Sequence, residues 1–338
     1  MDVTVLGPQR RTTATRTAVA ELIPTGSVAT VNAGWRERES ADTELGEVLG
    51  GRMVNLRLYQ RWQELVNEDP DYAAAERGLT ELLEEQQTVY AQRLFHAVAA
   101  IEEVNRRDKM STVRAAAVAD GIRALRALDT WHLAEVASSR HRFYAETSIG
   151  DRESVRRHRL ELAELVHDSA GLVIAGGHVG VLLHLLHVFG LVTMIKEPVI
   201  TWSAGAMALS DRVVLFGTHR PAGRRLPEVW AEGLGVFPGA LVFPHPRHRL
   251  PMHDPYQLAL LARRFKSWSC LLFDDGARVD LTGSWPPPVG ARWLTRDGAV
   301  WARTEDHIVE ERAGVPFDES GHPARRPIDA DVVTARTA

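Results

Sequence analysis

A serine followed by small residues, directly after a short apolar run, is the strongest chemical signal in this sequence. The run Pro198-Val199-Ile200 leads into Trp202-Ser203-Ala204-Gly205-Ala206-Met207. An apolar strand that breaks at a serine and turns into a helix is typical of a nucleophile elbow, which exposes the hydroxyl at a sheet edge. The pattern therefore predicts Ser203 as a nucleophile and the backbone N–H of Ala204 as one donor of an oxyanion hole.

Two later apolar runs end in residues that could serve as the base and the acid. Leu241 to Phe243 is followed by Pro244-His245, and Leu271 to Phe273 is followed by Asp274-Asp275. A serine hydroxyl needs a base within hydrogen-bond reach, and the base needs a third group to orient it. Because parallel strands present their carboxyl ends at one edge, we expect a triad in the chain order serine, histidine, aspartate.

A pair of glycines marks a fourth strand end. The run Leu172 to Ala175 continues into Gly176-Gly177-His178 and then into a helical stretch from Val181 to Leu186. Two glycines let the main chain approach a ligand closely and adopt backbone angles that other residues avoid. They are predicted to provide the second oxyanion donor, and an ordinary strand-to-helix turn is the alternative.

Each of these residues also has a structural interpretation without chemistry. Ser203 could cap the helix that follows it, since hydroxyls satisfy free N–H groups at helix starts. His245 stands beside prolines, as many surface-loop histidines do, and Asp274-Asp275-Gly276 is a common turn.

Metal binding is a second class of chemistry to weigh, because histidines gather at two places. The residues concerned are His245, His248, His253 and Asp254 in one segment, and His184 and His187 in another. Neither group follows a recognised pattern of ligands such as His-Glu-x-x-His. The expectation is that the protein uses no metal and no cofactor.

Composition narrows the remaining classes. The chain has 338 residues, a formal net charge of -4 and one cysteine, Cys270, so neither a nucleic-acid partner nor a disulfide framework is expected, although Arg152 to Arg159 is locally basic. The start at Asp2 and Val3 lacks the features of a signal peptide, and the apolar stretch Val179 to Met194 is too short to cross a bilayer. A cytoplasmic protein without a membrane partner is predicted.

Short β-rich runs alternate with helical stretches along most of the chain, which predicts an α/β fold with a mostly parallel sheet flanked by helices. Residues 1–70 and 169–316 are assigned to this α/β domain, and residues 317–338 to a flexible tail. The predicted strands are Val3 to Leu6, Val28 to Val31, Met53 to Leu58, Leu172 to Ala175, Val199 to Trp202, Val213 to Phe216, Leu241 to Phe243 and Leu271 to Phe273. After Pro286-Pro287-Pro288, the runs Arg292 to Leu294 and Val300 to Ala302 predict a terminal hairpin.

Residues 71–168 contain no strand signal and are predicted to form a helical insertion. Apolar residues from Leu79 to Val104 recur at steps of three and four, Arg106 to Lys109 interrupts the pattern, and Ser111 could cap a second long helix. Such a helical hairpin could pack on its own sheet, pair with a second subunit as a homodimer, or cover the site as a lid.

The order of these motifs resembles that of the serine peptidases that include dipeptidase E and cyanophycinase. The resemblance covers residues 171–283 well and the first sixty residues weakly, and it leaves out the helical insertion. It implies a class I glutamine amidotransferase-like fold, Ser203 as nucleophile, His245 as general base and Asp275 as the acidic member. It also implies Gly177 and Ala204 as the oxyanion donors.

Several residues depart from the family pattern. Thr201 stands where glycine is usual, His178 replaces an expected asparagine, and Leu6-Gly7-Pro8-Gln9 differs from a glycine-rich first loop. Asp275 is one methylene shorter than the glutamate of cyanophycinase-like sequences. Glutamine amidotransferase chemistry itself is disfavoured, because it needs a cysteine at the elbow and Cys270 lies in another strand.

The resulting prediction is a serine hydrolase, a peptidase that cleaves a small peptide or isopeptide amide through an acyl-enzyme. The family's preference for acidic substrates implies a positive pocket, for which Arg247 and Arg249 are the candidates. Gly176 and His178 are the other predicted substrate-binding residues. The alternative is a catalytically inactive member of the same fold that binds a ligand or acts as a dimeric interaction protein.

Overall fold

The computed structural model describes residues 2–9, 14–105, 111–216, 226–281 and 288–312. The strands are β1 (Val3–Leu6), β2 (Val28–Val31), β3 (Met53–Asn55), β4 (Gly171–Ile174), β5 (Val199–Trp202), β6 (Arg212–Phe216), β7 (Pro227–Glu232), β8 (Ala240–Pro244), β9 (Ser269–Phe273), β10 (Arg278–Leu281), β11 (Arg292–Leu294), β12 (Val300–Arg303) and β13 (Ile308–Arg312).

The α-helices are α1 (Ala14–Leu22), α2 (Thr43–Val48), α3 (Leu58–Glu68), α4 (Pro70–Asn105), α5 (Thr112–Thr147), α6 (Glu153–His167), α7 (Val179–Val188), α8 (Ala204–Leu209), α9 (Pro246–Arg249) and α10 (Pro255–Arg264). Three short 3-10 helices are η1 (Ala33–Arg38), η2 (Ile149–Asp151) and η3 (Leu191–Met194).

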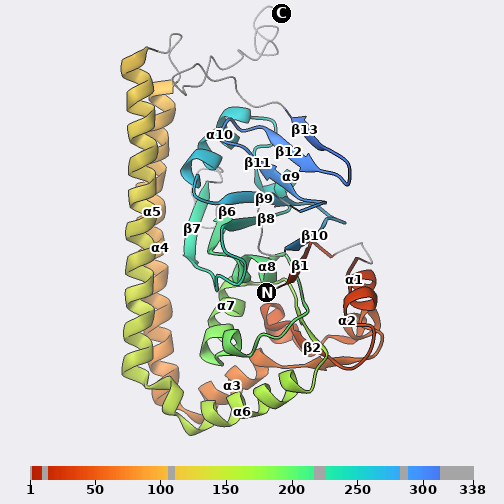
Figure 1. Cartoon of the computed structure of the whole chain (residues 1–338). Coiled ribbons are helices and arrows are strands. Elements are labelled where there is room, and N and C mark those ends of the chain that lie inside the picture. The colour runs from red at the N-terminus through yellow and green to blue at the C-terminus, as the bar shows by residue number, and fades with distance from the viewer. Residues whose placement is uncertain (1, 10–13, 106–110, 217–225, 282–287, 313–338) are drawn as a thin grey trace, which may run out of the picture.

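The main sheet has the strand order β10-β1-β5-β4-β2-β3. All neighbouring pairs from β1 to β3 are parallel, and β10 joins the edge of β1 in the antiparallel direction. A mixed α/β chain with a mostly parallel sheet and a long helical segment is confirmed at this level (Figure 1).

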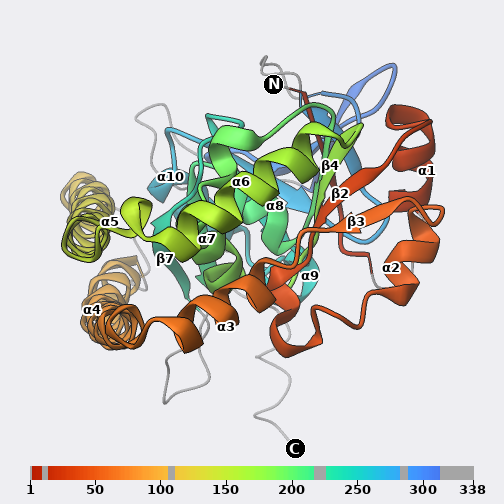
Figure 2. The same ribbon diagram turned by 90° about the horizontal axis from the view of Figure 1, so that it is seen from below.

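The central strands are apolar on both faces because helices cover both sides of the sheet. In β5, Val199 packs with α7 and α8, whereas Ile200 packs with α1 and α2 on the opposite side. Leu172 and Val173 of β4 divide in the same way, as successive side chains of a strand must. Figure 2 shows α1 and α2 on one side of the sheet and α3, α6, α7 and α8 on the other.

The expectation of a single sheet is wrong for several strands. Strands β8 and β9 lie in a second sheet of order β13-β12-β11-β9-β8, and β6 and β7 form a separate two-stranded sheet. A buried apolar run looks the same in sequence whichever sheet it joins, so the pattern identified the strands without their partners. The predicted strand Met53 to Leu58 is also shorter, since it ends at Asn55 and Leu58 begins α3.

Helices α4 and α5 form the predicted helical hairpin, which runs along one side of the molecule (Figure 1). Ser111 caps α5, since its hydroxyl accepts a hydrogen bond from the Arg114 N–H at 3.3 Å. The apolar stripe of α4 is largely buried and shares a hydrophobic core with α5, α10 and β8. The hairpin therefore packs on its own chain, which is one of the three arrangements that the sequence allowed.

A buried ion pair joins the hairpin to the rest of the chain. The Arg264 side chain on α10 donates to both carboxylate oxygens of Asp129 on α5, at 2.7 and 2.6 Å. Arg264 also donates to the Tyr90 hydroxyl at 2.6 Å and to the Pro227 carbonyl at 2.6 Å. The Arg264 and Asp129 side chains are only 3% and 2% exposed, so each charge depends on the other.

None of the described helices combines the length and apolar character needed to cross a bilayer.

Cys270 is buried in β9, and burial raises the pKa of its thiol to about 12. The predicted hairpin is present as the antiparallel pair β11 and β12. Arg106 to Lys109, Pro286-Pro287 and the predicted tail 317–338 lie outside the described residues.

We expect Asp129→Ala to lower the free energy of unfolding by about 3–5 kcal/mol, because it leaves a buried arginine without its acidic partner. Asp120→Ala is the matched control on the same helix. The Asp120–Arg123 pair is 73% and 64% exposed, and losing it is expected to cost about 1 kcal/mol or less. Urea denaturation of the three proteins measures both effects, and similar losses in the two variants would contradict a structural role for the buried pair.

Candidate active site

A cavity of about 1420 Å³ lies at the carboxyl ends of the strands. Residues at or just after the carboxyl ends of five strands line it. They are Pro8 and Gln9 after β1, Trp35 and Arg36 after β2, Gly176 to His178 after β4, Trp202 and Ser203 at the end of β5, and Pro244 and His245 at the end of β8. The remaining wall includes residues of α4, Arg140 of α5, and residues of α2, α3, α7, α8, β6 and β7. The cavity is thus shared between the α/β sheet edge and the helical hairpin.

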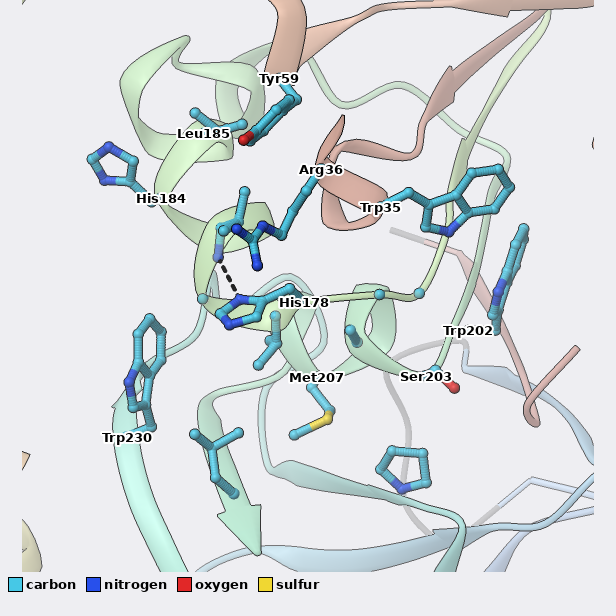
Figure 3. Close-up of a pocket in the computed structure, with 18 of the residues that line it drawn as sticks. Trp35, Arg36, Tyr59, His178, His184, Leu185, Trp202, Ser203, Met207 and Trp230 are labelled. Carbon is cyan, nitrogen blue, oxygen red and sulfur yellow. Dashed lines mark hydrogen bonds between the residues drawn. The ribbon is translucent and has the colours of Figure 1, made fainter. Parts of the chain in front are cut away.

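Ser203 has the backbone geometry of a nucleophile elbow. It connects β5 to α8 with φ of 50° and ψ of -118°, a region that residues with a side chain rarely adopt. Its hydroxyl makes no cap hydrogen bond to α8. The helix-capping interpretation of Ser203 therefore fails, and the strained bend exposes the hydroxyl at the cavity (Figure 3).

Close packing behind the bend holds this conformation in place. A Cβ atom added to Gly205 would lie 2.5 Å from the Ile174 carbonyl oxygen and 2.5 Å from Thr201 Oγ1. Thr201 is fully buried, and its hydroxyl donates a hydrogen bond to the same Ile174 carbonyl at 3.0 Å. The threonine that departs from the family pattern is therefore accommodated because β4 accepts its hydroxyl.

The glycine pair after β4 brings a second turn against Ser203. Gly177 has φ of 132°, and an added Cβ would lie 2.4 Å from the Gly34 carbonyl carbon. An added Cβ at Gly176 would lie 2.9 Å from Ser203 Cβ. In the described part of the chain, the N–H groups of Gly177 and Ala204 form no hydrogen bond. Both predicted oxyanion donors are therefore unsatisfied beside the serine.

His178 has a structural role that the sequence did not indicate. Its Nδ1 accepts a hydrogen bond from the Val181 N–H at 3.2 Å, so it caps α7 and its ring proton lies on Nε2 (Figure 3). Desolvation by the surrounding walls, together with the Arg36 charge, lowers the pKa of His178. A neutral imidazole with a free Nε2–H is a donor suited to an oxygen of a ligand.

His245 lines the same cavity from the end of β8. Its backbone is left-handed, with φ of 55°, and its N–H donates to the Phe273 carbonyl of β9 at 3.0 Å. The bond to β9 fixes the main chain at this position. The structure brings Ser203 and His245 to one cavity, and among the described residues Ser203 Oγ forms no hydrogen bond.

The predicted acidic member lies elsewhere. Asp275 is exposed in the turn between β9 and β10, outside the cavity lining, and makes no hydrogen bond to the described residues. Its neighbour Asp274 pairs with Arg292 and, at 3.4 Å, with Nε of Arg247. Arg247 is thus directed at Asp274, whereas Arg249, the other predicted substrate-binding arginine, lines the cavity.

Sequence reasoning missed several cavity residues. Arg36 has φ of 59° and ψ of -127°, nearly the conformation of Ser203, and it lies above His178 in Figure 3. Arg140 of α5 also lines the cavity, as do four of the nine tryptophans: Trp35, Trp62, Trp202 and Trp230. The position of Trp35 and Arg36 just after a strand was a usable signal, but nothing in the sequence placed the helical insertion against this edge.

A carboxylate and an imidazole meet at the far side of the cavity. Glu76 Oε1 lies 2.7 Å from His184 Nε2, and the Glu76 carboxylate accepts from Trp62 Nε1 at 2.8 Å. Burial, followed by the charge of Arg140, lowers the pKa of the neighbouring His187 to about 4, so its imidazole is neutral near pH 7. Within the described ranges, no group of three or more metal-ligating side chains is arranged to hold an ion.

No protein-family model matches this chain, and no curated protein matches it at a significant level. The resemblance to the dipeptidase E and cyanophycinase peptidases therefore rests on the motifs themselves.

We expect Gly177→Ala to destabilise the fold by about 1–3 kcal/mol or more, because the new methyl group meets the Gly34 backbone and the positive φ disfavours a side chain. Gly78→Ala in α4 is the matched control. No atom lies within 4 Å of a Cβ added there, and alanine in place of glycine within a helix is expected to stabilise by about 0.5–1 kcal/mol. Urea denaturation gives both values, and an unchanged stability of Gly177→Ala would rule out the tight contact between the two turns.

Proposed function

We propose that this protein is a serine hydrolase in which Ser203 is the nucleophile and His245 the general base. The observation that carries the proposal is the backbone of Ser203, which is held at positive φ between β5 and α8 and faces a large cavity. Strained residues of this kind cost about 1–3 kcal/mol and cluster at active sites. Close packing of the neighbouring turns holds this conformation but does not require a serine there, since glycine adopts positive φ without strain.

The chemistry that follows is acyl transfer. Ser203 Oγ attacks the carbonyl carbon of an amide while His245 accepts the hydroxyl proton. The negative charge that develops on the carbonyl oxygen is stabilised by the N–H groups of Gly177 and Ala204. When the C–N bond breaks, His245 returns the proton to the leaving amine, and water then hydrolyses the acyl-enzyme by the reverse steps.

The proposed fold and substrate come from the resemblance. The parallel order β1-β5-β4-β2-β3 with its elbow after β5 supports a class I glutamine amidotransferase-like fold. A small peptide or isopeptide is the proposed substrate, and the cavity volume of about 1420 Å³ supports a ligand of that size. A cytoplasmic location is part of the same proposal, supported by the single buried thiol of Cys270.

One observation favours the alternative of an inactive ligand-binding protein, since Ser203 Oγ lacks a hydrogen bond to His245 in the described part of the chain. Catalytic hydrogen bonds are often long before substrate binds, so the same geometry is also compatible with a hydrolase. Exposed apolar side chains on the hairpin, Leu82, Val89 and Trp131, support the further proposal of a homodimer through this element.

A fluorophosphonate probe is expected to label Ser203 covalently, and mass spectrometry of the digested protein locates the label. Ser203→Ala should abolish labelling, and His245→Ala should slow it by about 10³-fold or more, because the hydroxyl loses its base. His248→Ala is the matched control. Its ring lies 6.4 Å from that of His245 and outside the cavity lining, so this variant should label at the parent rate. A parent protein that stays unlabelled at Ser203 would support the inactive alternative.

The exposed position of Asp275 leads to a separate expectation. Because Asp275 makes no hydrogen bond to the described residues, Asp275→Asn should slow labelling far less than the loss of about 10⁴-fold seen when a triad aspartate loses its charge. The labelling rate of Asp275→Asn against that of the parent measures this. A loss as large as that of His245→Ala would show that the turn between β9 and β10 moves and that Asp275 orients the imidazole.

A further inference from the structure

Arg140 on α5 places a guanidinium in the cavity wall, where no described residue serves as its acidic partner. Its Nε and Nη1 atoms are buried and make no hydrogen bond to the described residues. The Arg140 guanidinium carbon lies over the Trp230 ring, 5.4 Å from the ring centre. Both side chains line the cavity that contains Ser203.

The surroundings of Arg140 do not neutralise its charge. Tyr144, one helical turn further along α5, also has a buried hydroxyl without a hydrogen bond to the described residues. Burial lowers the pKa of Arg140 and raises that of Tyr144, and the interaction between these two groups opposes both shifts without cancelling them. Both oxygens of the Glu76 carboxylate accept from Trp62 Nε1 at 2.8 Å, and Oε1 lies 2.7 Å from His184 Nε2. An unpaired buried charge costs several kcal/mol, which an anionic ligand would offset.

Trp230 packs between Arg140 and the turn that lies beside Ser203. A Cβ atom added to Gly180 would lie 3.1 Å from both Trp230 Cζ2 and His178 Cε1, so the indole packs beside the turn that follows Gly176 and Gly177. In Figure 3, Trp230 and His184 lie at one side of the cavity and Ser203 at the other, with His178 between them. Aromatic side chains, Trp35, Tyr59, Trp62 and Trp202, form much of the remaining lining.

We propose that Arg140 binds the carboxylate of a small ligand whose aromatic or apolar body packs against the tryptophans of this cavity. Guanidinium and carboxylate form paired, charge-assisted hydrogen bonds, which makes arginine well suited to this class of ligand. The helical hairpin then supplies the anion-binding residue, and the sheet edge supplies the reactive one. The inference concerns binding in the same cavity and holds whether or not Ser203 is reactive.

The test compares N-acetyl-phenylalanine, which carries a carboxylate, with N-acetyl-phenylalaninamide, which has the same body without the charge. Binding is measured by isothermal titration calorimetry on full-length Ser203→Ala protein, so that no hydrolysis interferes. Arg140→Met is added to this background, and Arg142→Met serves as the matched control because Arg142 is exposed on the same helix and does not line the cavity.

We expect the carboxylate to bind at least about tenfold more weakly to Arg140→Met than to the parent or to Arg142→Met, since a charge-assisted contact is lost. The amide should bind all three proteins equally and more weakly than the carboxylate binds the parent. Equal binding of the two probes to the parent, no binding of the carboxylate at millimolar concentration, or unchanged binding to Arg140→Met would each overturn the proposal.

Unfolding curves without ligand separate binding from a structural role. Removing an unpaired buried charge while keeping an apolar stem should leave the urea midpoint of Arg140→Met equal to or above that of the parent. A marked fall in the midpoint would show that Arg140 supports the fold instead, and would overturn the proposal. Arg140→Lys keeps the charge without the planar guanidinium and should bind the carboxylate with intermediate strength. Failure of the fluorophosphonate experiment would leave all these outcomes unchanged.

Discussion

The site depends on the contact between backbone turns that follow neighbouring parallel strands. Gly34, Gly177 and Gly205 each stand where a Cβ atom would meet another main chain at 3.0 Å or less. This contact leaves the chain little room beside Ser203, so the positive φ of that serine is imposed by its neighbours and not by its own preference. The same contact brings the hydroxyl together with the N–H groups of Gly177 and Ala204.

The helical hairpin both packs on its own chain and lines the cavity. Its apolar stripe and the buried Arg264–Asp129 pair attach it to α10 and the second sheet. That attachment holds the start of α4 and the end of α5 near the strand ends, where Glu76 of α4 and Arg140 of α5 line the cavity. Because the hairpin is held in place by a buried core, side chains such as Arg140 lose little conformational entropy when a ligand binds.

The three predicted triad residues illustrate what can be inferred from a sequence. Ser203 and His245 were expected at strand ends because strand termini and turn residues are local features, and both line one cavity. Asp275 follows a strand in the same way, yet that strand belongs to the second sheet and its turn is exposed, with Asp274 held by two arginines. Position at a strand end therefore does not by itself bring a residue to the site, because it does not say to which sheet the strand belongs or where its turn lies.

By itself, the sequence determined the α/β class, the elbow at Ser203, the glycine turn at Gly176-Gly177 and the existence of the long helical hairpin. Each depends on short-range patterns: period-two or period-3.6 apolar spacing, and glycine where the backbone needs it. Tertiary structure alone decided the division of the strands between sheets, the hydrogen bond that accommodates Thr201, and the meeting of Arg140 with Trp230. These contacts join residues far apart in the chain, and their energies depend on burial and on partners that no local pattern specifies.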